Sequence, residues 1–256
     1  MMTSARTLRI DLSYKGTEFR GFAENPGVRT VGGELRQALE TVLGEEIELT
    51  VAGRTDAGVH ALGQVVSFHT TNEGVDPDLL RDSLNGMCSS DLRVQAVTLA
   101  EADFNARFSA SKRTYHYNIL NSPTADPLHA DVEWHIGPPL DVDAMNDAAS
   151  RFAGEHDFTS FCRRPKDRLD EPLIRRVLTS EWIWIAEQRL RFVIEGNAFC
   201  HQMVRSLTGF CVAAGFGKRS ADEFEAVVRA KDRSAAPPIA PPHGLTLMQV
   251  SYQKSG

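Results

Sequence analysis

The sequence lacks long apolar runs and paired cysteines. No stretch approaches the roughly 18 apolar residues that a membrane span needs, and the N-terminal MMTSARTLRIDLSYKG has no apolar signal-peptide core. The four cysteines, Cys88, Cys162, Cys200 and Cys211, form no CxxC pair and no zinc-like spacing with histidine. We therefore expect no membrane or export signal, a cytoplasmic location, and free buried thiols in a reducing compartment.

Motifs of nucleotide, metal and serine-hydrolase chemistry are also missing. The sequence contains no Walker loop, no GxGxxG, no HExxH, no GxSxG and no EF-hand loop. The eight histidines are scattered, and neither His60 with His69 nor His129 with His135 has a third ligand at a suitable spacing. We therefore expect no metal and no organic cofactor, so any chemistry must come from side chains.

Acidic residues outnumber basic ones in the chain as a whole, but one segment is rich in basic residues. The formal net charge of −6 argues mildly against a nucleic-acid partner, because such proteins usually carry a basic footprint. One segment, FCRRPKDRLDEPLIRR, is nonetheless basic; its cations are Arg163, Arg164, Lys166, Arg168, Arg175 and Arg176. By itself the segment is typical of a solvated loop. It becomes an RNA-binding candidate only if another feature points to RNA.

The first half of the chain has the pattern β-α-β-β-α-β. Alternation of apolar and polar residues predicts strands at 6–14, 47–51, 64–69 and 92–99. Thr30 is the expected N-cap of a helix whose apolar stripe ends at Val42. Asp76 precedes the Pro that opens a second helix, whose inward residues should include Met87.

The same order recurs after Ala106. The pattern predicts strands at 113–120, 177–186, 189–195 and 245–252, and helices beginning near 141, 203 and 220. We expect an α+β fold with two ferredoxin-like β-α-β-β-α-β halves, 1–107 and 108–256, the second with an extra helix. The halves should share a mostly antiparallel sheet, with a cleft between them for a sizeable ligand.

One stretch, AGRTDAGVHALGQVVSF, places Arg54, Asp56 and His60 among small residues. Small residues let backbone and polar side chains approach a large, flat ligand without obstruction. The plain alternative is a turn, because Asp is favoured there for its own backbone hydrogen bond. For His60 a structural hydrogen bond is more typical than a polarising role. The stretch alone leaves both interpretations open.

Further motifs lie in order along the chain: YKGTEFRGF, RTVGGELRQAL, FNARFSASKRTYHY, HDFTSF, NAFCHQMVR and PPHGL. Together with GRTDAGVHALGQVVSF they resemble the tRNA pseudouridine synthase A family, over almost the whole chain. The resemblance implies a cofactor-free intramolecular isomerase that converts uridine to pseudouridine at nucleotides 38, 39 and 40 of the tRNA anticodon stem-loop. It also implies a homodimer that binds one tRNA with both subunits.

The resemblance assigns roles to particular residues. Asp56 would be the catalytic aspartate, Tyr115 the tyrosine that stacks near the flipped uracil, and Arg205 the partner of that aspartate. Arg54 would help to hold the RNA backbone, and Leu245 would line the base pocket. Thr55, His60 and Arg107 are further candidate substrate contacts, and Arg163, Arg164, Lys166, Arg168 and Arg175 are the candidate RNA-binding residues.

The chemistry of the reaction agrees with this set. The C1′–N1 bond must break, the uracil must rotate, and C5 must join C1′. A carboxylate can attack C1′ or stabilise its positive charge, as in a retaining glycosidase, or it can remove the C2′ proton; the sequence leaves these routes open. An ionised aspartate that is shielded from water needs a cationic partner, and the Tyr115 phenol is a candidate base for the C5 proton.

Two other functions remain open at this point. A non-catalytic RNA-binding or RNA-folding module would keep the basic residues without needing Asp56. An aspartate enzyme for a small nucleoside would not need the basic segment. The chain also departs from the family where GFAENPGVRT replaces a glutamine-containing segment, and where Asn105 stands at a position commonly occupied by histidine.

Overall fold

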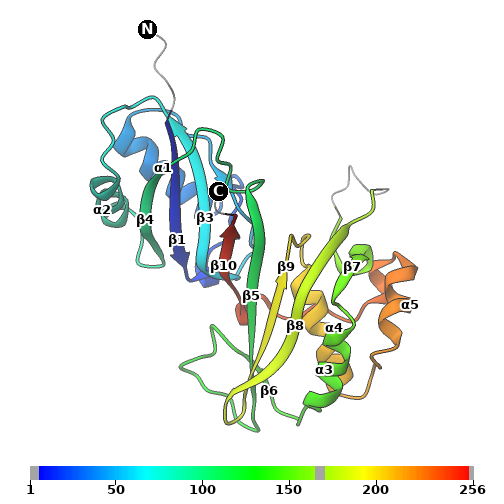
Figure 1. Ribbon diagram of the computed structural model, residues 1–256. Coiled ribbons are helices and arrows are strands. Elements are labelled where there is room, and N and C mark those ends of the chain that lie inside the picture. Colours follow the sequence, from blue (N-terminus) through cyan, green and yellow to red (C-terminus); the bar gives the residue numbers. More distant parts are fainter. Residues whose placement is uncertain (1–5, 165–170, 254–256) are drawn as a thin grey trace. The chain divides into compact units, whose positions relative to one another are not determined.

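The computed structural model describes residues 6–164 and 171–253, which divide into two compact units (Figure 1). The first unit runs to Ser111 and includes the chain from Leu247 onward; the second is Lys112–Thr246. The boundary therefore lies after residue 111, whereas the sequence places it after residue 107. Most of the final strand, predicted for the second half, belongs to the first unit because it lies beside a strand of that unit.

The first unit has the predicted β-α-β-β-α-β order. Its elements are β1 (Arg6–Tyr14), α1 (Val31–Leu43), β2 (Thr50–Val51), β3 (His60–Thr70), α2 (Pro77–Met87) and β4 (Leu92–Ala100), followed at the end of the chain by β10 (Leu245–Tyr252). The strands lie in the order β4-β1-β3-β10, and β2 also pairs with β3. Because β1 is antiparallel to both β3 and β4, the ferredoxin-like interpretation of this half is confirmed.

The two helices of this unit begin where the sequence predicts. The Thr30 hydroxyl accepts the Gly33 N–H at 3.2 Å, and the Asp76 carboxylate accepts the Asp78 N–H at 2.9 Å. The prediction that Val42 and Met87 face the core is wrong, because their exposed fractions are 37% and 48%. Both residues lie in the last turn of their helix, where the apolar stripe continues beyond the buried part of the helix.

The second unit repeats the theme with additions. Its strands are β5 (Ala110–Asn121), β6 (Trp134–Ile136), β7 (Gly154–Asp157), β8 (Ile174–Ala186) and β9 (Arg189–Gly196), and its helices are α3 (Val142–Ser150), α4 (Met203–Gly215) and α5 (Glu223–Ala230). The sheet order is β5-β9-β8-β7, with antiparallel pairs throughout this path, and β6 runs parallel to β5. The predicted β8–β9 hairpin and the extra helix are confirmed.

Helix α4 is buried almost all round. One side contacts α3 (Figure 1), and the other lies against the proline-rich segment that precedes β10. A Cβ added at Gly209 would lie only 2.2 Å from the Pro238 carbonyl oxygen, so the helix and the segment touch through backbone. Phe152, Phe161 and Phe224 surround Phe210 of this helix in an aromatic cluster. No helix among the described residues is long and apolar enough to cross a membrane.

The cysteines differ from the sequence-based expectation of free thiols. Cys162 and Cys200 form a disulfide with their Cα atoms 5.9 Å apart, so the expectation is wrong for this pair. Cys88 and Cys211 are buried and free, and burial raises the pKa of these thiols to about 11 and about 12. The pair escaped the sequence reasoning because 38 positions and the β8–β9 hairpin separate its members.

This pairing predicts the thiol count of the denatured chain. Without reductant, iodoacetamide should modify only Cys88 and Cys211, because the other two sulfurs are joined. After reduction, all four cysteines should be modified. Intact-mass spectrometry with peptide mapping measures both states, and four adducts on the unreduced chain would contradict the disulfide.

Candidate active site

The loop that carries the RTDAG motif lies between β2 and β3 and is held by the segment that follows β1. The Phe22 N–H donates to the Thr55 carbonyl at 3.1 Å, and the Gly58 N–H donates to the Phe19 carbonyl at 3.3 Å. Gly21 has φ +96°, and a Cβ there would lie 3.0 Å from the Thr55 carbonyl oxygen. The two segments therefore approach each other too closely for a side chain, which fixes the loop from one side.

A buried hydrogen-bond network supports the same loop from beneath. The Tyr14 hydroxyl lies 2.7 Å from the Thr55 hydroxyl, and the Gln64 side-chain amide donates to the Tyr14 oxygen at 3.1 Å and to the Gly53 carbonyl at 2.8 Å. Burial raises the pKa of Tyr14 to about 12, so its phenol stays protonated and available to this network. The hydroxyl of Thr55, a predicted substrate contact, is part of this interior network.

His60 anchors the other end of the loop. Its side chain is buried, and its Nδ1 accepts the Gly16 N–H at 2.9 Å. This contact is the structural hydrogen bond that the sequence left as an alternative to a polarising role. By contrast, Arg54 is exposed and Asp56 is half-buried. The loop therefore turns Thr55 and His60 inward and leaves Arg54 and Asp56 at its accessible side.

Arg107 lies on a turn between β4 and β5. Its side chain is exposed and its guanidinium carbon lies 5.2 Å from the centre of the Phe108 ring. The Asn105 side-chain oxygen accepts the N–H groups of Arg107 and Phe108, each at 3.0 Å. Asn105, one of the two departures from the family pattern, thus shapes the turn that presents this arginine.

In the second unit Tyr115 lies within β5, opposite Ile194 of β9. It is 7% exposed, and its ring meets the edge of Phe199 with centroids 5.3 Å apart. The strand itself was predicted at 113–120, and both of its tyrosines, Tyr115 and Tyr117, are buried. The aromatic face that the resemblance assigns to the base is therefore held rigidly by strand pairing and by Phe199.

Arg205 is the third residue of α4 and is also nearly buried. Its Nε donates to the Ala240 carbonyl at 2.8 Å, and the Ala240 N–H donates back to the Arg205 carbonyl at 3.1 Å. The neighbouring Tyr117 hydroxyl donates to the Pro241 carbonyl at 2.8 Å. Burial raises the pKa of Tyr117 far above its usual value, and the positive charge of Arg205 opposes that rise. These bonds fasten α4 and β5 to the PPHGL motif.

The glycine of that motif has a specific packing role. A Cβ added at Gly244 would lie 2.6 Å from the ring of Tyr117 and 2.9 Å from the Asn118 carbonyl oxygen. Only a glycine lets the backbone pass this close to β5. Leu245, the predicted base-pocket residue, follows at once as the first residue of β10 and is buried.

The candidate catalytic residues divide between the units. Asp56 belongs to the first unit, and Tyr115 and Arg205 belong to the second. The structure brings Arg54, Thr55, Asp56 and His60 together in one loop. The pairing of Asp56 with Arg205 stays a prediction.

The candidate RNA-binding residues separate into three groups. Lys166 and Arg168 lie outside the described residues. Arg175 is on β8, where its guanidinium donates to the Ile174 carbonyl at 2.6 Å. Arg163 and Arg164 line a cavity of about 390 Å³.

Two residues that the sequence reasoning missed, Lys231 and Arg233, line the same cavity. The signal that could have found them is the short basic run RAKDR at the end of α5. The run lies outside every motif of the family, and nothing in the sequence connects it with Arg163 and Arg164.

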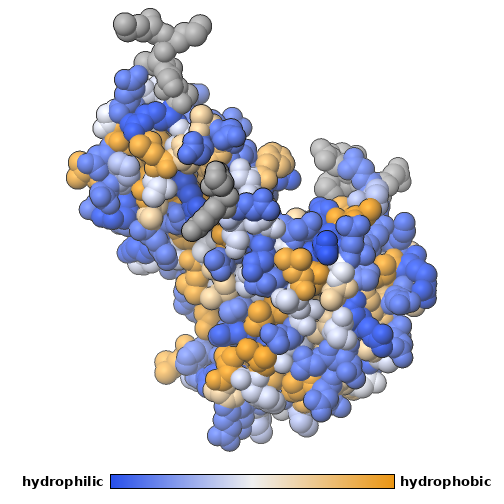
Figure 2. Space-filling model, viewed as in Figure 1, coloured by the Kyte–Doolittle hydropathy of each residue, from blue (hydrophilic) through white to orange (hydrophobic). Residues whose placement is uncertain are grey.

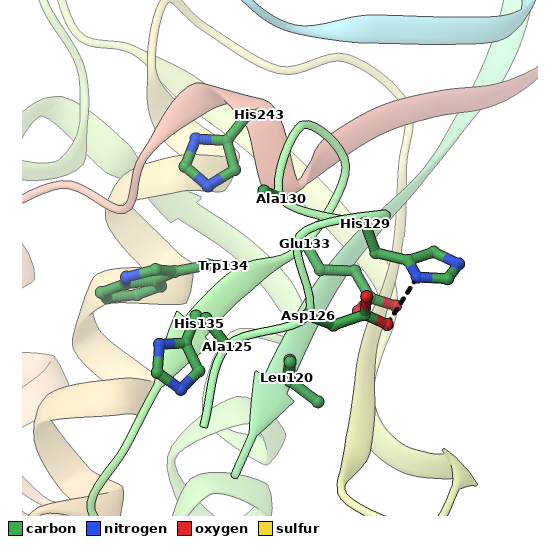
Figure 3. A pocket seen from close by; sticks show the side chains of 9 residues that line it. All are labelled: Leu120, Ala125, Asp126, His129, Ala130, Glu133, Trp134, His135 and His243. Atoms are coloured by element: carbon green, nitrogen blue, oxygen red, sulfur yellow. Dashed lines mark hydrogen bonds and ion pairs between the residues drawn. The ribbon is translucent and has the colours of Figure 1, made fainter. Parts of the chain in front are cut away.

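A second cavity of about 230 Å³ lies in the second unit beside β6 (Figure 3). The Asp126 carboxylate meets Nδ1 of His129 at 2.7 Å, and Arg189 donates to both Asp126 and Glu133. The acidic groups of this cavity are therefore neutralised within the protein. His129 and His135 both line it, but the described residues contain no cluster of three potential metal ligands.

Comparison with known proteins shows the family of the chain. Residues 12–109 and 148–253 match the family described as tRNA pseudouridine synthase. A protein named tRNA pseudouridine synthase A from Streptomyces avermitilis is 44% identical over 96% of this chain and 87% of its own length. One of the same name from Geobacillus sp. (strain WCH70) is 39% identical over 97% of this chain and 99% of its own. A protein of this name from Thermosipho melanesiensis is 37% identical over 95% of this chain and 98% of its own length.

These matches define the class of protein, an isomerase that modifies tRNA. More particularly, the chain belongs to the tRNA pseudouridine synthase family, because the match covers most of its length in both units. The resemblance inferred from the RTDAG, KRTYHY, HQMVR and PPHGL motifs is thereby confirmed.

The network beneath the loop predicts a stability effect. Replacing Tyr14 with Phe should lower the free energy of unfolding by about 2 kcal/mol, because Thr55 and Gln64 lose a buried partner. Tyr252→Phe is the matched control, since its hydroxyl donates to the Ala106 carbonyl at a partly exposed position. That variant should lose about 0.5 kcal/mol, because water can replace the bond. Urea denaturation of both variants measures the difference, and equal losses would argue against the buried network.

Proposed function

We propose that the chain isomerises uridine to pseudouridine at nucleotides 38, 39 and 40 of the tRNA anticodon stem-loop, with Asp56 as the essential carboxylate and without a cofactor. Family membership supports tRNA as the substrate. The observation that carries the residue assignment is the anchored loop. Thr55 and His60 hold it from within, so that the half-buried Asp56 is kept in one position at its accessible side.

In the proposed reaction the Asp56 carboxylate acts at the ribose of the target uridine. It either attacks C1′, so that the C1′–N1 bond breaks with its electrons on the uracil, or removes the C2′ proton to give a glycal. The uracil then rotates and C5 attacks C1′; this step breaks the bond between Asp56 and C1′ or, on the glycal route, is accompanied by return of the proton to C2′. The C5 proton then leaves to a base, and N1 takes up a proton. No atom is gained or lost overall, so the reaction needs no energy source.

Arg205 and Tyr115 have supporting roles in this proposal. A guanidinium near Asp56 would keep the carboxylate ionised in a site that excludes water. Arg205 can fill this role because its side chain is already held by the Ala240 carbonyl. Tyr115 would stack on the extruded uracil, offset part of the few kcal/mol that unstacking costs, and accept the C5 proton directly or through water.

The exposed arginines of the first unit suit contact with the tRNA backbone. Arg54 and Arg107 both extend from anchored turns and carry a guanidinium that can pair with phosphate oxygens. We therefore propose them as phosphate contacts that position the stem-loop. We place the enzyme in the cytoplasm, where its substrate would be available.

We also propose that the protein is a homodimer. The resemblance to the family suggests it, and exposed apolar side chains on β8 support it, since exposed apolar surface can mark an interaction site. Leu178, Ile183 and Trp184 are 44%, 39% and 54% exposed. Figure 2 shows hydrophobic residues gathered over β8 on this face of the second unit.

Tritium release from tRNA labelled at uracil C5 tests the proposed function, because C5 loses its hydrogen only when the base is detached and rejoined. The wild-type chain should release tritium from tRNA with uridine at 38, 39 or 40. Asp56→Asn should lower the rate on the order of 10³-fold or more while tRNA binding, measured by filter retention, is preserved. Asp103→Asn, which makes the same change at an exposed position away from the loop, should leave the rate unchanged.

The other outcomes are also informative. Release by both the wild-type chain and Asp56→Asn would remove Asp56 from the centre of the reaction. Release by neither, with tRNA binding intact, would favour the RNA-binding module. Release from free labelled uridine but not from tRNA would favour the enzyme for small nucleosides.

A further inference from the structure

A cationic pocket in the second unit has no role in the chemistry described above. Arg163 and Arg164 line it from the end of the 3₁₀ turn Phe158–Phe161, and Lys231 and Arg233 line it from the end of α5. We refer to it as the Arg233 pocket. Its volume is about 390 Å³, and the described residues that line it include a single carboxylate, that of Asp232.

Contacts within the protein fix the first pair of cations. The Cys162–Cys200 disulfide and the hydrogen bond from the Arg163 N–H to the His201 carbonyl, 2.9 Å long, join their segment to the residues before α4. One terminal nitrogen of Arg164 donates to the Thr159 hydroxyl at 2.8 Å. The Nε of Arg164 is buried and has no hydrogen-bond partner among the described residues. The segment that carries Arg163 and Arg164 is therefore held in place by a covalent bond and by hydrogen bonds.

The carboxylates near the pocket do not neutralise its charge. The Asp232 oxygens accept the N–H and the hydroxyl of Ser234 at 2.9 and 2.6 Å, which lowers the pKa of this carboxyl and commits it to a local turn. Lys231 Nζ lies 3.2 Å from an Asp157 oxygen. Among the described residues four cations thus face two carboxylates, which leaves an excess of positive charge; the Ser234 hydrogen bonds orient Asp232 and keep it ionised.

Arg233 forms no ion pair with the described residues. Its guanidinium donates a long hydrogen bond of 3.4 Å to the Pro237 carbonyl, a neutral acceptor. Burial lowers the pKa of Arg233, as is expected of a partly desolvated guanidinium that has no ion-pair partner among the described residues. A bound anion would restore the lost solvation and would use the planar donor fork of the side chain.

We propose that the Arg233 pocket binds a phosphodiester of the tRNA backbone, a site that rests on the proposed function. Arginine forks match the oxygens of a phosphate, and several cations around a cavity of this size suit a phosphate with part of its ribose. The pocket opens to the surface, because Arg163 is exposed and the Lys231 side chain is 62% exposed, so a polymer can reach it. The RNA contact of the second unit is then a discrete pocket and not the whole basic segment.

The test compares single charge removals. Arg233→Gln and Lys231→Gln should each weaken tRNA binding about tenfold at low salt and reduce the slope of log K against log[salt] by about one. Arg233→Lys keeps the charge without the fork, so it should preserve the slope and lose part of the affinity. Arg229→Gln is the matched control, because Arg229 lies on α5, pairs with Glu225 and does not line the pocket. It should bind tRNA as the wild-type chain does.

Equal thermal unfolding midpoints must first show that the variants are folded. Wild-type affinity and salt slope in both Arg233→Gln and Lys231→Gln would overturn the proposal. Calorimetry with inorganic phosphate distinguishes a free phosphate ion from a tRNA phosphodiester as the ligand of the pocket. Phosphate binding that Arg233→Gln abolishes, with an unchanged salt slope for tRNA, would assign the pocket to a free anion and overturn the tRNA contact.

The proposed isomerase activity is measured separately in the same protein preparations. Tritium release by the wild-type chain tests the isomerisation whether or not the pocket binds RNA. If the wild-type chain releases tritium and the pocket variants bind tRNA normally, only the pocket assignment fails. If the wild-type chain releases none, the failure is that of the proposed function.

Discussion

The buried hydrogen bonds of Tyr14, Thr55 and Gln64 are the interaction on which the rest of the candidate site depends. A loop rich in glycine and alanine has little side-chain packing of its own, so its conformation must be fixed by its neighbours. The network replaces that packing with bonds whose loss would leave polar groups unsatisfied in the interior. The position of Asp56 is therefore a consequence of contacts made beneath it, one of them by Tyr14, which lies 41 positions before Thr55 in the chain.

In the second unit, close contacts between backbone segments fix the positions of the candidate site residues. Gly209 lets α4 touch the proline-rich segment, and Gly244 lets the PPHGL motif pass over Tyr117. Between these two contacts Arg205 exchanges hydrogen bonds with Ala240. A charged side chain that is almost buried would otherwise be free to adopt many rotamers. Here it is preorganised, which favours an electrostatic role over general attraction of RNA.

The charge distribution resolves an apparent conflict in the composition. An acidic protein can bind a polyanion if its cations are gathered in one place, because binding responds to the local potential and not to the net charge of −6. The Arg233 pocket is such a place, with its cations drawn from two segments almost seventy positions apart. Among the described residues that line it, cations outnumber carboxylates, and Ser234 holds the Asp232 carboxylate in a local turn. Acidic surface outside such pockets would discourage nonspecific binding.

The sequence by itself determined the order of the longer helices and strands, the caps at Thr30 and Asp76, and the family, because these depend on local periodicity and on contiguous motifs; it did not predict the short strands β6 and β7. Only the tertiary structure decided that Thr55 and His60 turn inward, that Cys162 joins Cys200, and that Lys231 and Arg233 meet Arg163 and Arg164. Each of these depends on the path of the chain between distant residues. Periodicity records which face of an element is apolar, but not which remote segment comes to lie against it.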